Sequence, residues 1–214
     1  MATVLEQEVL TPVAPPMLMP TKSRELPAFP VDLDPFERQL TIEEAEALAE
    51  GRSFELIEGR MVFKMADKNH SNCQRVLVGE LYAYFKQNPI GVGLPENSVR
   101  LWPESRLNLR TPDVAVFLNE NLHAEQKYET RAPDLSIEIV SDDDRATEVF
   151  AKGRLYLEKG SRVVWIVFPS EQSVLIMTPA ERRWESERLT CPEVLPGFSL
   201  AVAEIFSWPT PQSA

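Results

Sequence analysis

The sequence is poor in cysteine, has no long apolar run and begins without a secretory pattern, and each shortage argues against a class of protein. Its two cysteines, Cys73 and Cys191, stand far apart and form no CxxC metal-ligand pair. No stretch of about 18 uninterrupted apolar residues is present, so a membrane span is not expected. Residues 1–10 lack the basic start and apolar run of a secretory signal. We therefore expect a reduced, cytoplasmic protein with no membrane association.

Basic residues are also in short supply, because 22 Lys and Arg face 33 Asp and Glu, for a net charge of −11. Nucleic-acid phosphates are bound mainly by Lys and Arg, so this balance argues against tight, charge-driven binding of bare nucleic acid. It does not exclude a nuclease, since a metal-binding active site needs carboxylates and a local basic face can coexist with an acidic total.

The chain is long enough for one domain with a real core, preceded by an arm of different composition. Residues 1–35 carry seven prolines and no apolar period, which predicts a disordered or loosely attached arm. The ordered domain is expected at 36–206, and 207–214 form a short tail. No internal repeat is evident.

The periodicity of apolar residues predicts a mixed α/β fold. Thr41 and Glu44 form a capping box for a helix that stops at Gly51. A hairpin is expected at 54–63, and an amphipathic helix at 69–87. Strands are expected at 98–102, 113–117, 135–140, 163–167, 174–177 and 183–189. A helix is expected to begin with Asp142, Asp143 and Asp144 as its N-caps and to end at about residue 159. A final helical turn is expected at 203–206. This order predicts a mixed β-sheet flanked by helices, with a crossover near 144–160.

Two carboxylates stand inside otherwise apolar strands. Asp113 begins one strand, and Glu138 lies within another. Burying an ionised carboxylate costs several kcal/mol unless a charge, a metal or hydrogen bonds compensate. A shared divalent cation, Mg²⁺ or Mn²⁺, would remove the repulsion between the two. In the alternative, each acid caps a strand end or pairs with an arginine such as Arg110 or Arg145.

Several segments of the sequence resemble the Uma2 family of "putative restriction endonucleases". They are 54–59, 110–115 and 133–141, followed in the family's order by Lys152, Tyr156, Gly160, Val164–Trp165 and 195–198. The resemblance covers about residues 36–206. It implies the nuclease fold known as PD-(D/E)XK.

The resemblance also implies roles for individual residues. Asp113 and Glu138 match the two metal-binding acids, with Mg²⁺ or Mn²⁺ as the expected cofactor. Val140 occupies the position of the lysine in the fold's Glu-x-Lys motif. The resemblance therefore implies that Lys152, on the following helix, supplies the lysine instead. Glu55 matches an acid that could complete the site. In addition, His70 matches a histidine at the head of the long helix.

Each of these residues also has a plain structural alternative. Lys152 lies four residues after Glu148 and could form only a solvated pair with it. Glu55 could face outward from the hairpin, and His70 could simply begin its helix. The acids at 142–144 depart from the family's Ser-Pro-Ser-Asp pattern and add negative charge beside the expected site.

The implied activity is metal-dependent hydrolysis of phosphodiester bonds in DNA. Asp113 and Glu138 would hold the metal, and Lys152 would orient water or offset charge in the transition state. The main alternative is a catalytically inactive nuclease-fold module that binds or regulates. Hydrolysis of sugars by a carboxylate pair ranks last, because only four Trp and four Tyr are available to line a cleft. A homodimer is compatible with the sequence.

The composition of the N-terminal arm leads to a first prediction. A chain that starts at Phe36 should unfold cooperatively, with a midpoint within about a few degrees of the full chain, because the arm has little to bury. Thermal unfolding followed by circular dichroism measures this. Loss of the cooperative transition would show that residues 1–35 pack into the core.

Overall fold

The computed structural model describes residues 38–209, apart from 124 and 142–143. All of them fall in one unit, Leu33–Ala214. The arm expected at 1–35 and residues 210–214 of the expected tail lie outside the described residues.

The centre of the fold is a six-stranded mixed sheet in the order β3-β4-β5-β6-β7-β8. Its strands are β3 (Gly91–Pro95), β4 (Val114–Leu118), β5 (Leu135–Ile139), β6 (Val163–Phe168), β7 (Ser173–Met177) and β8 (Arg182–Glu185). β5 and β6 are parallel, and every other neighbouring pair is antiparallel. The parallel pair is joined by helix α3 (Ala146–Glu158), which is the crossover that the sequence predicts.

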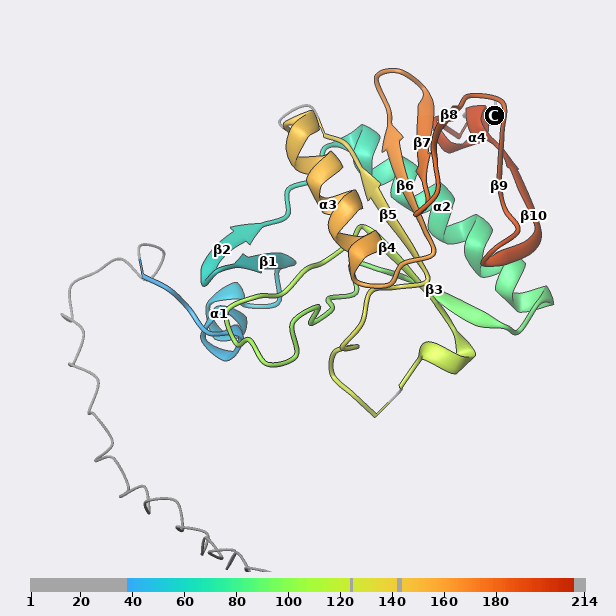
Figure 1. Ribbon diagram of the computed structural model, residues 1–214. Coiled ribbons are helices and arrows are strands. Elements are labelled where there is room, and N and C mark those ends of the chain that lie inside the picture. The colour runs from blue at the N-terminus through green and yellow to red at the C-terminus, as the bar shows by residue number, and fades with distance from the viewer. Residues whose placement is uncertain (1–37, 124, 142–143, 210–214) are drawn as a thin grey trace, which may run out of the picture. The chain divides into compact units, whose positions relative to one another are not determined.

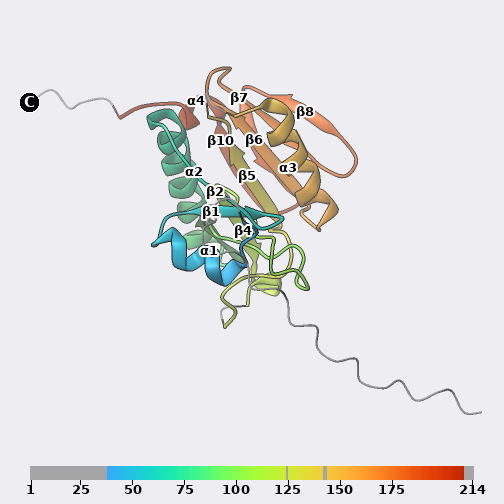
Figure 2. The same cartoon turned by 90° about the vertical axis from the view of Figure 1, so that its left-hand side faces the viewer.

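Helices cover both faces of this sheet. Figures 1 and 2 show α2 (Lys68–Gln87) on one face and α3 on the other. Because side chains alternate along a strand, Ile137 and Trp165 pack with the α2 face, and Ala115 and Ile166 pack with the α3 face. A small sheet of β9 (Arg188–Cys191) and β10 (Leu195–Ala201), followed by α4 (Val202–Ile205), joins the core on the α2 side.

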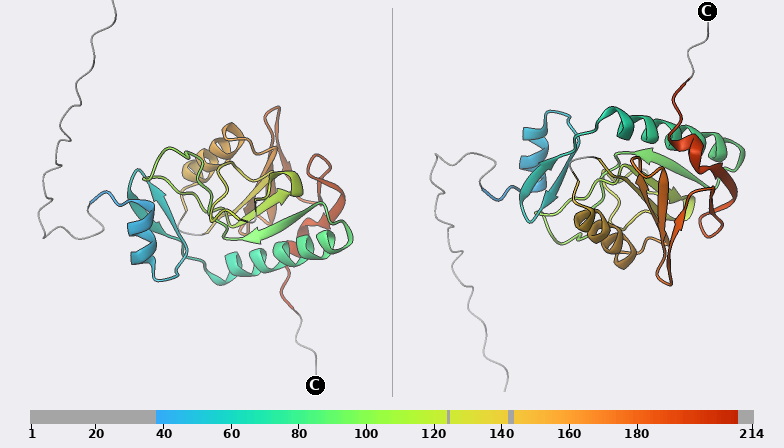
Figure 3. Two further views of the ribbon diagram at one scale, coloured as in Figure 1. Left: turned by 90° about the horizontal axis from the view of Figure 1, so that it is seen from below. Right: turned by 90° about the horizontal axis from the view of Figure 1, so that it is seen from above.

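The N-terminal part of the unit has its own apolar cluster, built on α1 (Ile42–Ala49) and the hairpin of β1 (Phe54–Ile57) and β2 (Arg60–Phe63) (Figure 3). The capping box of Thr41 and Glu44 is confirmed. The hairpin turns through Glu58 and Gly59, both at positive φ. Two such residues make the turn whose twist suits antiparallel strands.

Several elements expected from the sequence need correction. Residues 98–102 are not a strand, and only Val99 makes isolated bridges there, to Arg110 and Glu129. The strand expected at 183–189 is two strands, β8 and β9, which belong to different sheets. Strands β3 and β10 and the short 3₁₀ helix η1 (Asn119–Asn121) were not predicted.

The N-cap assignment of Asp144 is also wrong. Helix α3 begins at Ala146, and its N-cap Arg145 makes no side-chain capping bond. Asp144 instead accepts hydrogen bonds from the amide and hydroxyl of Ser141. Residues 142 and 143 lie outside the described part. The final helical turn is confirmed within one residue, as α4.

Crossing a bilayer would require a longer and more apolar helix than any found among the described residues.

The β1–β2 turn generates a prediction on stability. A Cβ at Gly59 would lie 2.7 Å from Cβ of Gln39 and 2.9 Å from its Cα, at a φ of +79°. Gly59→Ala should therefore cost about 1–3 kcal/mol of unfolding free energy. Gly79→Ala is the control, because an added Cβ there meets nothing within 4 Å inside α2. It should stabilise by about 0.5–1 kcal/mol. Urea unfolding of both variants measures the difference, and equal effects would contradict it.

Candidate active site

Asp113 directly precedes β4, and Glu138 lies on β5, the strand that pairs with β4. β4 pairs antiparallel with β5, with Val114 opposite Ile137. One residue further in the same register, Asp113 lies opposite Glu138, and opposed side chains project to one face of a sheet. Asp113 is 1% exposed and Glu138 is 4% exposed. The two acids therefore lie side by side as predicted, although Asp113 precedes its expected strand by one residue, and the cation that they would share stays a prediction.

Asp113 is bound by donors on both of its oxygens. Oδ1 forms a close ion pair with Nζ of Lys64, which also donates to the Thr111 carbonyl at 2.8 Å. Oδ2 accepts from the amide of Ile139 at 2.6 Å and lies 3.2 Å from Nε2 of His70. Lys64 follows β2 directly, and His70 lies in the first turn of α2. Three separate elements therefore converge on this one carboxylate.

Glu138 is bound by two side chains of α3. Its Oε1 accepts from the Tyr156 hydroxyl at 2.9 Å, and its Oε2 accepts from Nζ of Lys152 at 3.0 Å. Lys152 and Tyr156 are four residues apart and therefore share one face of the helix. Nζ of Lys152 also lies 3.2 Å from Oε1 of Glu55, which in turn accepts from the Thr111 amide. Lys152 thus links an acid of the sheet to an acid of the hairpin.

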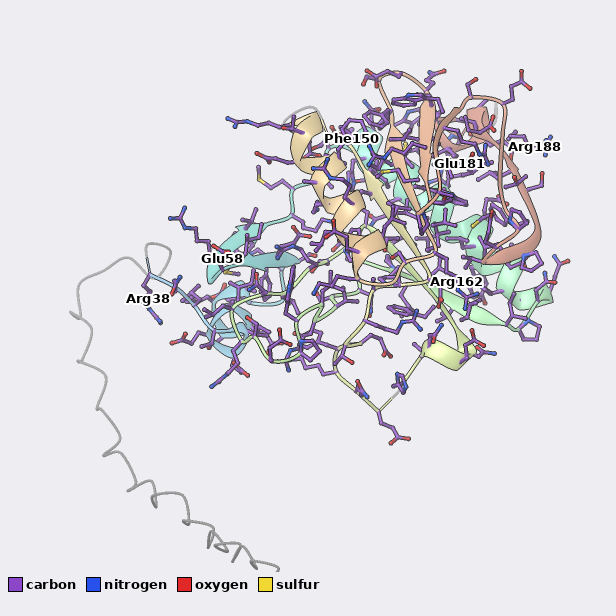
Figure 4. The ribbon with its side chains drawn as sticks, viewed as in Figure 1. Arg38, Glu58, Phe150, Arg162, Glu181 and Arg188 are labelled. Atoms are coloured by element: carbon purple, nitrogen blue, oxygen red, sulfur yellow. The ribbon has the colours of Figure 1, made fainter. Side chains whose placement is uncertain are left out.

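These charges lie in a cavity of about 430 Å³. Its walls come from β1, β2, the start of α2, the strand ends and α3. Figure 4 shows Glu58 on the β1–β2 hairpin and Phe150 on α3, the two elements between which the cavity lies. Apolar side chains contribute much of the remaining lining, and Val62 and Met65 among them are exposed. The cavity therefore has a charged interior and an apolar wall along the hairpin.

Burial disfavours the charged form of Asp113 and of its basic neighbours, but their mutual attraction prevails. Burial alone would raise the pKa of Asp113, yet the Lys64 ammonium and the His70 imidazole hold this pKa below its ordinary value. Burial would lower the pKa of Lys64, yet the charges of Asp113 and Glu138 raise it. The pKa of His70 is raised in the same way by its hydrogen bond to Asp113. Asp113 and Lys64 are therefore both charged at neutral pH.

Glu138 behaves differently from Asp113. Burial raises its pKa, and the attraction of Lys152 and Lys64 offsets only part of this effect. Burial and the nearby Glu138 raise the pKa of Tyr156 well above its ordinary value, so this hydroxyl remains a donor. Burial would lower the pKa of Lys152, but Glu138 and Glu55 raise it. The pKa values of the two acids are thus shifted in opposite directions, so that Asp113 is ionised and Glu138 is more easily protonated.

The alternative in which the two acids pair with an arginine is wrong, whereas Asp113 does bind a strand end, because it accepts the amide of Ile139, the last residue of β5. Arg110 donates to the carbonyls of Leu56 and Leu109, and Arg145 is an exposed residue that lies 4.0 Å from Glu148. The counter-ions of the acids are lysines instead.

The alternatives for Lys152 and Glu55 are wrong, and the one for His70 is correct but incomplete. Lys152 forms its ion pairs with Glu138 and Glu55, so it is not merely a solvated partner of Glu148. Glu55 is 5% exposed and does not face outward. His70 belongs to the first turn of its helix, as that alternative held, and it also contacts Asp113.

Lys64 is the residue of this cluster that the sequence reasoning missed. A signal was available in the hairpin, because the turn at Glu58 and Gly59 fixes the pairing of its strands. Glu55 is opposite Val62, so both project to one face. Lys64 follows two residues after Val62 and shares that face by the period of a strand. The register would therefore have placed Lys64 beside Glu55.

Known proteins and structures similar to this chain include one family and a crystal structure of a protein described as a nuclease. The Uma2 family model, described as "Putative restriction endonuclease", matches residues 41–203. No curated protein matches the sequence. A crystal structure from Anabaena variabilis, described as "a putative nuclease belonging to DUF820", is similar at a TM-score of 0.67 and 26% identity, over 79% of this chain and 98% of that chain. A cryo-EM structure of a DrdV–DNA complex reaches only a TM-score of 0.31 and 11% identity, over 66% of this chain and 14% of that chain, which is too slight to carry an argument.

The opposite pKa directions of the two acids predict unequal effects on stability at pH 7. Asp113→Asn should cost about 3 kcal/mol, because it leaves Lys64 buried without its counter-ion. Glu138→Gln should cost less than about 1 kcal/mol, because the fold already disfavours the ionised form of Glu138 and Lys152 keeps Glu55. Urea unfolding followed by tryptophan fluorescence compares them. Equal losses would show that the two acids are not differentiated.

Proposed function

The chain belongs to the Uma2 family, described as "Putative restriction endonuclease", and from this membership and the charges of the cavity we propose that it is a metal-dependent endonuclease that hydrolyses phosphodiester bonds in DNA. Its mixed α/β fold is of the restriction-endonuclease type, as the similar nuclease structure indicates.

One observation carries the proposal. Asp113, directly before β4, and Glu138, on the paired strand β5, line one cavity, and Lys152 projects its ammonium to within 3.0 Å of Glu138. Two acids on neighbouring strands repel each other, which is a cost without benefit to folding alone. Buried acids that are unfavourable for folding are typical of groups that a protein retains for chemistry.

The donor set fits an open magnesium or manganese site rather than a closed cage. Within the described residues, no three Asp, Glu, His or Cys side chains are grouped closely enough to enclose a metal by themselves. Mg²⁺ does not need such a cage, since it is usually held by one or two carboxylates and completes its shell with water and substrate phosphate. Asp113 and Glu138 supply two hard oxygen donors, and the cavity beside them leaves room for the remainder.

The reaction would be the attack of water on phosphorus, with a new P–O bond formed and the bond to the leaving oxygen broken. A divalent ion held by Asp113 and Glu138 would polarise the phosphate and make the water more acidic. Lys152, fixed by Glu138 and Glu55, would offset the negative charge that builds on the phosphate oxygens. His70 would keep Asp113 in its orientation.

A catalytically inactive module of the same fold is the second candidate, and one observation favours it. Both lysines of the cavity are already paired with its acids, so the charges are nearly balanced without any metal. The direction of Lys152 favours the active enzyme instead. Its amine points into the cavity toward Glu138, where a lysine without a role in the site would extend to solvent.

The setting of the enzyme is also a proposal. Cys73 and Cys191 are buried, free thiols, which suits the reducing cytoplasm. We propose DNA as the substrate on the strength of the family description, and a homodimer would be one way to address two strands.

Removing single site residues tests the proposed roles. Asp113→Asn and Glu138→Gln should each reduce Mg²⁺-dependent cleavage to background, because the cation loses a charged ligand. Lys152→Ala should slow cleavage about 10²- to 10³-fold and leave Mn²⁺ affinity nearly unchanged or slightly tighter. Single-turnover cleavage of plasmid and of single-stranded DNA with Mg²⁺, Mn²⁺ or EDTA, and Mn²⁺ titration of the same variants, measure both.

The control is Lys86→Ala, an exposed lysine in the last turn of α2, which should cleave like the parent. If the parent fails to cleave any substrate with either metal, the inactive module is the better description. If Lys152→Ala cleaves like the parent, Lys152 is a structural ion-pair residue only.

A further inference from the structure

Lys64 occupies a position in the cavity that the proposed reaction leaves without a role. It follows β2 directly, its side chain is 15% exposed, and its ammonium binds Oδ1 of Asp113 and the Thr111 carbonyl. Its backbone amide is anchored separately, to the carbonyl of Ser53 at 3.1 Å. The side chain can therefore change direction without loss of that backbone contact.

The other oxygen of Asp113 is already committed to the protein. Oδ2 accepts from the amide of Ile139, which is part of β5, and it lies beside Nε2 of the buried His70. A cation that binds Asp113 must therefore approach Oδ1, the oxygen that Lys64 holds. A carboxylate oxygen has lone pairs for two partners, but two cations about 4 Å apart in a poorly hydrated cavity repel each other by several kcal/mol.

The charge balance of the cavity makes this competition specific to Lys64. The cavity holds three buried acids, and Lys152 contacts two of them, Glu55 and Glu138. Lys152 can therefore remain in place when a cation binds, because it keeps Glu55 as a partner. Lys64 has one acidic partner within ion-pair distance, Asp113. If a divalent ion takes over that partner, the ammonium of Lys64 is the group that must move.

We propose that Lys64 is an internal competitor of the divalent cation: it holds the metal-binding oxygen of Asp113, sets the metal concentration needed to load the site, and on loading turns into the cavity toward the substrate phosphate. This proposal rests on the metal-dependent function argued above. Lys64 is thus a residue that tunes metal binding, distinct from Lys152, which keeps its place. Its freed ammonium adds positive charge where an anionic substrate enters an otherwise acidic protein.

The test measures metal binding and stability of the full chain, without recourse to activity. Lys64→Met should tighten Mn²⁺ binding at least about tenfold in calorimetric titration, because the competing charge is gone. In EDTA the variant should melt below the parent, since Asp113 is left buried without its counter-ion. Saturating Mn²⁺ should raise the melting temperature of the variant by more than that of the parent.

Three further variants sharpen the comparison. Lys64→Gln removes the charge but keeps a donor, and it should reproduce the tightening if the Met variant folds poorly. Lys64→Arg keeps the charge and should bind Mn²⁺ no more tightly than the parent. Lys152→Met, which removes the other ammonium of the cavity, should change the Mn²⁺ dissociation constant much less than Lys64→Met.

The possible failures are distinguishable. If the parent binds Mn²⁺ and both neutral variants bind it with the parent's dissociation constant, Lys64 is only a structural ion-pair residue and the competition is refuted. Equal losses of melting temperature with and without Mn²⁺ would refute it as well. If neither the parent nor any Lys64 variant binds Mn²⁺, and Asp113→Asn is indistinguishable from the parent in the titration, the metal-dependent function itself fails.

Discussion

Burying a carboxylate costs several kcal/mol unless cations or hydrogen bonds accompany it, and this protein buries three around one cavity. Their counter-ions come from elements on opposite sides of that cavity, Lys64 from the end of the hairpin and Lys152 from α3. The hairpin, the central strands and α3 are therefore tied to each other through charge as well as apolar packing. The arrangement of the whole site follows from the need to keep these acids accompanied.

The sequence predicted the centre of the fold better than its edges. Central strands such as β5 and β6 are apolar and β-branched because both of their faces are covered, and this composition is legible without a structure. β3 escaped prediction because Gly91 and Gly93 read as breakers. A Cβ at Gly91 would lie 2.4 Å from the Phe117 carbonyl, so close packing, which the sequence does not display, requires glycine there. Residues 98–102 alternate like a strand, but within them only Val99 forms β-bridges, and these are isolated.

Site residues could be predicted from the sequence where a charged residue lies in an apolar segment. Asp113 and Glu138 stand out because each is an acid in an apolar strand, and Lys152 was reached through family resemblance rather than pattern. Lys64 does not stand out in its local sequence, since a lysine between a hairpin and a helix is ordinary. Its partner Asp113 is 49 positions away, and only the register of the hairpin and the sheet brings the two together. Long-range charge pairs of this kind need tertiary structure to be seen.

The crossover position of Lys152 has a consequence for how the protein is made. During synthesis Lys64 leaves the ribosome well before Asp113, so that acid emerges into a chain that already contains its counter-ion. Glu138 emerges before Lys152, which follows 14 positions later on α3. Until α3 has formed and docked, β5 carries an acid that apolar surroundings reject. Burial of β5 in the nascent sheet is therefore coupled to the formation of α3, which is synthesised after it.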